Sequence, residues 1–129
     1  GHVFFRDKFP GFDDGIYAGL RMIEILSKKR KSFTKLLKDV PQYVSTEEIK
    51  IATTEEKKFD IVEKVKDYAI EEGYAFEDID GVRVEWWDAW ALIRASNTGP
   101  NITLRFEAKD QATLDDVQKE FMDFIQTLL

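Results

Sequence analysis

Polar side chains that suit an anion are concentrated in one short segment, Arg94 to Pro100, which lies between two apolar stretches. Arg94 carries a planar guanidinium whose donors match two oxygens of a phosphate or carboxylate at once. Neutral donors follow it on Ser96, Asn97 and Thr98. Asn97 and Gly99 tolerate left-handed backbone angles, so the N–H groups between them can form a concave nest. The segment predicts an anion-binding hairpin loop, although a plain polar turn uses the same residue types.

Composition limits the class of protein that carries this loop. A chain of 129 residues with 43% hydrophobic and 34% charged residues suits one compact globular domain. The formal net charge of -6 argues against a nucleic-acid or anionic-membrane surface, since either needs a basic face. The sequence has no Cys, no apolar run of membrane-spanning length and no recognisable signal sequence, so we expect a cytoplasmic protein.

The pattern before Pro41 is mainly helical. Residues 2–5 read as the end of a strand, and residues 13–27 predict a helix. The apolar face of that helix is made of Ile16, Leu20 and Ile23. A second, short helix over residues 33–39 should stop before Pro41, because proline disfavours helical angles in the residue that precedes it.

The pattern after Pro41 alternates between strand and helix. Strands are predicted at 47–52, 82–86, 90–94 and 102–106. A helix should begin with a capping box of Thr53 and Glu56 and end at Gly73, with Phe59, Val62, Val65 and Ala69 on its inner face. The last helix has apolar residues at helical spacing: Leu114, Val117, Phe121, Phe124, Ile125 and Leu128. The predicted class is therefore α+β: a four-stranded, mainly antiparallel sheet with two helices on one face, in the order strand-helix-strand-strand-strand-helix, preceded by a short helical segment.

Other polar and aromatic groups have competing interpretations. The run Asp78-Ile79-Asp80-Gly81 resembles the start of a metal loop but lacks the further ligands at the required spacing, which favours a β-turn and no metal site. Trp86, Trp87 and Trp90 could form a platform for a sugar ring. We expect instead that Trp86 and Trp90 lie in the sheet core, and that Trp87 on the opposite face contacts another domain.

Four segments, taken in order, resemble the α-D-phosphohexomutases. They are Gly1-His2-Val3-Phe4-Phe5, Gly11-Phe12-Asp13-Asp14-Gly15-Ile16-Tyr17-Ala18, Ser45-Thr46-Glu47-Glu48-Ile49 and Trp90-Ala91-Leu92-Ile93-Arg94-Ala95-Ser96-Asn97-Thr98. The resemblance covers the whole chain. It is to the C-terminal part of a phosphomannomutase/phosphoglucomutase, which interconverts hexose 1-phosphates and 6-phosphates by intramolecular phosphoryl transfer.

The resemblance implies a role for each part of the chain. Residues 1–40 would be the end of the sugar-binding third domain plus a hinge, and residues 41–129 the phosphate-binding fourth domain. Arg94, Ser96, Asn97 and Thr98 would bind the substrate phosphate that is not being transferred. His2, the only histidine, would match a family residue that assists proton transfer. The implied partners are a hexose phosphate and the missing N-terminal domains, and Mg²⁺ is implied for the full-length enzyme but not for this fragment.

Parts of the family pattern are not in this sequence. They are the phosphoserine loop, the Asp-rich metal loop, and the Glu and Ser of the sugar-binding loop. We therefore expect the chain to have no mutase activity alone. The alternative function is a free-standing anion-binding or protein-interaction module with the same fold.

Overall fold

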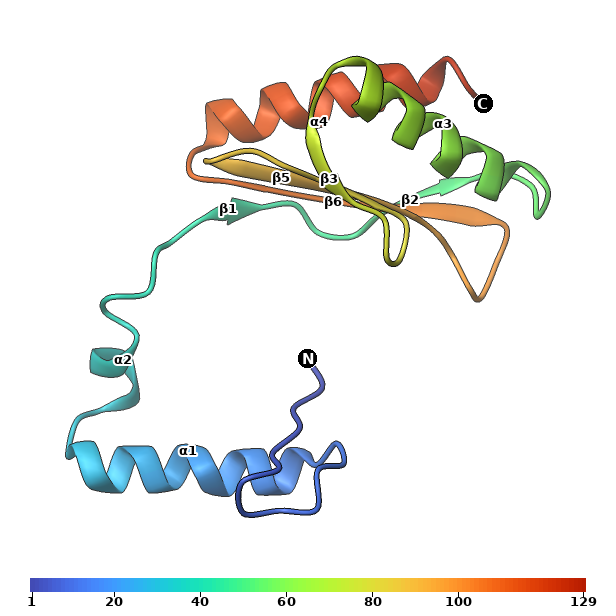
Figure 1. Ribbon diagram of the computed structural model, residues 1–129. Coiled ribbons are helices and arrows are strands. Elements are labelled where there is room, and N and C mark those ends of the chain that lie inside the picture. The colour runs from blue at the N-terminus through green and yellow to red at the C-terminus, as the bar shows by residue number, and fades with distance from the viewer. The chain divides into compact units, whose positions relative to one another are not determined.

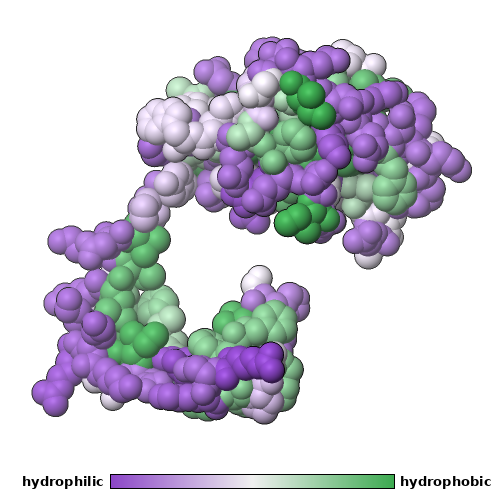
Figure 2. All heavy atoms as spheres, viewed as in Figure 1, coloured by the Kyte–Doolittle hydropathy of each residue, from purple (hydrophilic) through white to green (hydrophobic).

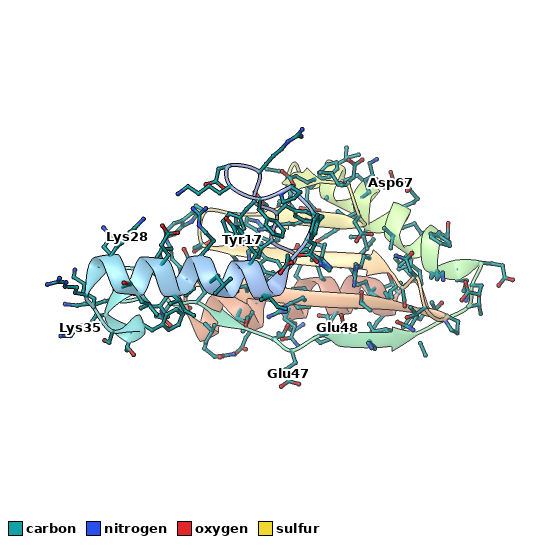
Figure 3. The ribbon with its side chains drawn as sticks, turned by 90° about the horizontal axis from the view of Figure 1, so that it is seen from below. Tyr17, Lys28, Lys35, Glu47, Glu48 and Asp67 are labelled. Carbon is teal, nitrogen blue, oxygen red and sulfur yellow. The ribbon has the colours of Figure 1, made fainter.

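The computed structural model describes all 129 residues, which form two compact units, Gly1–Pro41 and Gln42–Leu129. In the first unit, α1 spans Gly15–Lys29 and α2 spans Phe33–Leu36 (Figure 1). The observed helix begins two residues after the predicted start at residue 13, because Asp14 caps it. The Asp14 side chain accepts a hydrogen bond from the Tyr17 N–H at 2.8 Å. Figure 3 shows Lys28 near the C-terminal end of α1, where a cation stabilises the helix dipole.

The apolar residues of the first unit have little to pack against. The predicted strand end at residues 2–5 is reduced to a single bridge between Phe4 and Asp13. No side chain of this unit is buried, and Ile16 on α1 is 81% exposed. Figure 2 shows hydrophobic residues at the surface around α2, where Phe33 and Leu37 are also exposed. The predicted apolar face of α1 is therefore present but uncovered.

The second unit is an antiparallel sheet covered on one face by two helices (Figure 1). Its strands are β1 (Val44–Ser45), β2 (Ile49–Ala52), β3 (Ala75–Glu77), β4 (Val82–Glu85), β5 (Ala89–Ala95) and β6 (Asn101–Ala108). The order is β1-β6-β5-β4-β3, with β2 also paired to β6. The helices are α3 (Lys57–Glu71) and α4 (Gln111–Gln126). The predicted antiparallel α+β layer is confirmed.

The sheet has two more strands than predicted. β1 and β3 contain only two and three residues, too few for an alternating pattern to be visible in the sequence. β1 pairs with β6, and β3 pairs with β4 through the turn that the sequence predicted at Asp78–Gly81. β1 joins β2 along the outer side of β6, and β3 becomes the edge strand beside β4. β5 lies between β4 and β6.

The core lies between the sheet and the two helices. Its largest fully buried side chains come from β6, β5, α3 and α4: Phe106, Ile102, Leu104, Ile93, Ile61, Val65, Phe121 and Ile125 among them. Two details of α3 were predicted wrongly. Phe59 is 58% exposed and Ile61 is buried instead, because Ile61 and not Phe59 lies on the helix face that carries Val62, Val65 and Ala69. The side chain that accepts a bond from the Lys57 N–H is that of Thr54, at 3.2 Å, and not that of Thr53.

The three tryptophans lie in different surroundings. Trp86 packs against the core as predicted. Trp90 was predicted to be core and instead lies on the open face of the sheet, where its Nε1 donates to Glu107 at 3.0 Å and the Arg83 guanidinium stacks on its ring. The turn at Asp88 explains the error. The Trp86 N–H donates to the Ala89 carbonyl at 2.8 Å, and the chain enters β5 with the Ala89 side chain facing the core and the Trp90 side chain facing the open side of the sheet. Trp87 is 81% exposed.

Candidate anion-binding site

The site is the loop that joins β5 to β6. These two strands pair from Ala89↔Ala108 to Ala95↔Ile102, and the Ser96 N–H then bonds to the Asn101 carbonyl at 2.9 Å. Because β5 is paired on both sides, the loop stands on a rigid support. The hairpin position predicted from sequence is confirmed, and it brings Arg94, Ser96, Asn97 and Thr98 together at the same end of the sheet.

Ser96 organises the inside of the loop. It is 9% exposed, and its Oγ lies 3.3 Å from Thr98 Oγ1 and also accepts the Thr98 N–H at 3.3 Å. Asn97 and Thr98 are exposed. The Asn97 N–H has no partner within the chain, so it is available to an incoming acceptor. The Gly99 N–H also has no partner within the chain, so the loop offers two free backbone donors together with exposed amide and hydroxyl side chains.

Arg94 reaches the site from the open face of the sheet. Inward-facing residues of β5 alternate with half-buried ones, and Arg94 belongs to the second set. Its Nε donates to Thr103 Oγ1 at 3.2 Å, and its Nη1 lies 3.1 Å from Asp80 Oδ2. These two contacts hold the guanidinium in place while leaving more than a third of the side chain exposed. A fixed, accessible guanidinium suits an anionic ligand.

The turn before β4 borders the same end of the sheet. A hollow of about 200 Å³ lies between this turn and α3, with Asp78, Asp80, Lys66 and Asn97 in its lining. Lys66 Nζ pairs with Asp78 Oδ2 at 2.6 Å; this hydrogen bond lowers the pKa of Asp78 and raises the pKa of Lys66. The lining of this hollow therefore contains both positively and negatively charged side chains beside the loop.

One buried residue beside the loop was not predicted from the sequence. Lys58, on the first turn of α3, is only 4% exposed, and its Nζ donates to the Ser96 carbonyl at 2.8 Å. A lysine in a charged helix normally lies in solvent. No feature of the sequence separates Lys58 from the neighbouring Lys57.

His2 belongs to the other unit. Its Nδ1 pairs with Asp13 Oδ2, and the second oxygen of Asp13 accepts the Val3 N–H at 3.0 Å. The hydrogen bond with His2 is the main cause of a lowered pKa of Asp13. The His2 side chain is 81% exposed. Asp13 thus orients the imidazole.

Two further structural findings concern metals and membranes. No group of three or more His, Asp or Glu side chains is arranged to hold a metal ion. No helix has the length and apolar character needed to cross a membrane.

Fold and loop together define an α+β domain that presents an arginine and small polar side chains at one hairpin. The family description "Phosphoglucomutase/phosphomannomutase, C-terminal domain" matches residues 48–124, and "alpha/beta/alpha domain III" of the same family matches residues 1–44. The chain therefore belongs to the phosphoglucomutase/phosphomannomutase family, and the resemblance seen in the sequence is confirmed.

Individual relatives give the same result. The chain is 44% identical to a phosphomannomutase/phosphoglucomutase of Pseudomonas syringae pv. tomato, over 94% of this chain and 26% of that protein. It is 40% identical to a protein of the same description from Pseudomonas aeruginosa, over 99% of this chain and 28% of that one. A crystal structure of a family protein from Burkholderia thailandensis superposes with a TM-score of 0.83 at 38% identity, over 99% of this chain and 27% of that chain. The chain thus spans about a quarter of the length of these relatives.

Proposed function

We propose that residues 41–129 bind the non-transferred phosphate of a hexose phosphate in a phosphomannomutase/phosphoglucomutase. Arg94 would pair with the phosphate oxygens, and Ser96, Asn97 and Thr98 would surround them. The observation that carries this proposal is the loop itself: an accessible guanidinium and the free Asn97 N–H lie at one end of a firmly paired hairpin. Family membership supports the choice of ligand.

In this proposal the loop positions substrate and breaks no bond. A mutase must present first one and then the other end of a sugar bisphosphate to the same transferring group. A fixed grip on the remote phosphate supplies binding energy and orientation in both arrangements. Phosphoryl transfer depends mainly on such positioning and on charge stabilisation.

The first unit would contribute the end of the sugar-binding domain and the hinge. Within it, Asp13 holds His2 through Nδ1, which leaves Nε2 available to exchange a proton with a sugar hydroxyl. The Mg²⁺ of the full-length enzyme would neutralise charge on the transferring phosphoryl group. The family resemblance assigns that metal to the full-length enzyme and not to this fragment.

The test is a titration of the 129-residue chain with inorganic phosphate and with mannose 1-phosphate, followed by ¹H–¹⁵N NMR. The amides of Ser96 to Gly99 should shift, and Arg94→Ala should abolish the shifts. Arg83→Ala is the control, because it removes the same charge from a strand of the same sheet while Arg83 pairs with Glu85. An unmoved loop in the wild-type chain would overturn the proposal.

A second measurement concerns catalysis. The isolated chain should not convert mannose 1-phosphate or glucose 1-phosphate, because the phosphoserine and metal loops of the family are absent from its sequence. Measurable turnover by the purified chain would contradict this part of the proposal.

A further inference from the structure

Lys58 is a buried cation that the proposed function leaves without a role. It belongs to the first turn of α3 and is 4% exposed, whereas lysine is almost never buried without a partner. Its Nζ donates to the Ser96 carbonyl at 2.8 Å and lies 3.4 Å from the Gly99 carbonyl. The third neighbour of this ammonium is Glu55 Oε2, at 2.7 Å. Two of its three partners are therefore backbone atoms of the anion loop.

The bond to the Ser96 carbonyl determines the direction of the next amide. A peptide unit is planar and trans, so its C=O and the following N–H point to opposite sides. When Lys58 draws the Ser96 carbonyl toward the protein interior, the Asn97 N–H must point away from it. That N–H, like the Gly99 N–H, has no hydrogen-bond acceptor within the chain.

A second contact ties the same region of α3 to the loop. The Thr53 N–H, just before this helix, donates to the Pro100 carbonyl at 2.9 Å. The loop is therefore fastened at Ser96, Gly99 and Pro100 to the segment that opens α3.

We propose that Lys58 is the positioning residue of the anion loop: it holds the Ser96 and Gly99 carbonyls inward so that the Asn97 N–H faces the phosphate. This inference rests on the proposed function and assigns Lys58 no direct contact with substrate. Without the ammonium, the Ser96 carbonyl loses its donor and the Gly99 carbonyl keeps only the Asn101 N–H, so the loop relaxes and the outward N–H is no longer oriented.

The test compares Lys58→Met with Lys64→Met in the 129-residue chain. Methionine keeps the apolar stem and removes the charge; Lys64 lies on the same helix but pairs with Asp60 in solvent. Inorganic phosphate is titrated at constant ionic strength, well below the melting temperature of each variant. Lys58→Met should bind phosphate about tenfold more weakly, a change of about 1.4 kcal/mol. Lys64→Met should bind like the wild type.

The outcomes separate this inference from the function on which it rests. If the wild-type loop does not respond to phosphate, both fail. If the wild type responds and folded Lys58→Met binds equally well, Lys58 is merely structural and only the present inference is overturned. If Lys58→Met has a lower melting temperature but an unchanged affinity for phosphate, the present inference is likewise overturned.

A measurement on the wild type decides the case if Lys58→Met does not fold. The ζ-ammonium group of Lys58, which is only 4% exposed, is followed by ¹H–¹⁵N NMR. It should shift during the phosphate titration with the same midpoint as the Asn97 amide. An ammonium resonance that stays unmoved while the loop amides shift would overturn the inference.

Discussion

Asp80 Oδ2 lies 3.1 Å from Arg94 Nη1, so the guanidinium that we assign to phosphate is already paired with a carboxylate. This contact depends on the turn that precedes β4. Gly81 has φ of +86°, and a Cβ there would lie 2.4 Å from the Ile93 carbonyl and 2.5 Å from Arg94 Cβ. The absence of a side chain at position 81 lets the turn approach β5 and brings Asp80 to the arginine.

Asp80→Asn should strengthen phosphate binding. A carboxylate about 6 Å from a bound anion repels it by about 0.7 kcal/mol per unit charge in water, which is roughly a threefold change in affinity. NMR titration with inorganic phosphate measures the dissociation constant. Asp78→Asn is the matched control, since Asp78 lies in the same turn but pairs with Lys66. Weaker phosphate binding by Asp80→Asn would contradict this prediction. It would mean that Asp80 helps binding by orienting the Arg94 guanidinium, and that this effect exceeds its competition with phosphate for the same guanidinium.

Gly81→Ala should destabilise the second unit by about 3 kcal/mol, because a strained backbone angle is combined with a steric clash against β5. Gly73→Ala provides the comparison. Gly73 also has a positive φ, of +71°, but a Cβ there meets no atom within 4 Å, so only the backbone cost of about 1 kcal/mol applies. Urea unfolding of both variants measures the difference. Equal losses in the free energy of unfolding for the two variants would show that the turn at Gly81 does not pack closely against β5.

Stability should fall between pH 10 and 12. The hydroxyls of Tyr68 and Tyr74 both donate to Glu120 Oε1, at 3.0 and 2.9 Å. Burial, assisted by this carboxylate, raises the pKa of each tyrosine from 10.0 to about 12. Because the folded state holds these protons more tightly than the unfolded state, the stabilisation is complete below pH 10 and is lost as the pH rises toward 12.

The tyrosine variants test that assignment. Tyr74→Phe should lower the free energy of unfolding by about 1 kcal/mol at pH 8 through the lost hydrogen bond, and should reduce the decline above pH 10. The exposed Tyr43 makes no bond to Glu120, so Tyr43→Phe is the control. An alkaline decline that is the same in Tyr74→Phe and in the wild type would exclude the Tyr74–Glu120 contact as its cause.

Removal of residues 1–41 should leave the second unit folded. Every buried residue lies between Lys58 and Ile125, and Gln42–Leu129 forms its own compact unit. The shortened chain should unfold in urea at the midpoint of the second unit in the complete chain, and the Ser96 to Gly99 amides should show the same phosphate shifts. A molten sheet in the shortened chain would contradict this independence.

Much of the second unit followed from local patterns. Alternation along β4 and β6 and the helical spacing of α4 identified much of the core, since burial of one face imposes a period that can be read directly. The same reasoning failed for Trp90, where a turn changed the set of inward-facing residues. It also failed for β1 and β3, which are too short to show an alternating pattern; the partner of β1 is β6, far along the chain, whereas β3 pairs with the next strand, β4.

The sequence by itself determined the composition of the anion loop, because Arg94, Ser96, Asn97 and Thr98 are nearly adjacent and their chemistry is local. It also determined the α+β class and the family resemblance. Only the tertiary structure decided which distant groups act on that loop. Asp80 reaches Arg94 through a neighbouring strand, and Lys58 reaches Ser96 from a helix 38 residues earlier. Such contacts depend on how the sheet and α3 pack, and no local spacing encodes them.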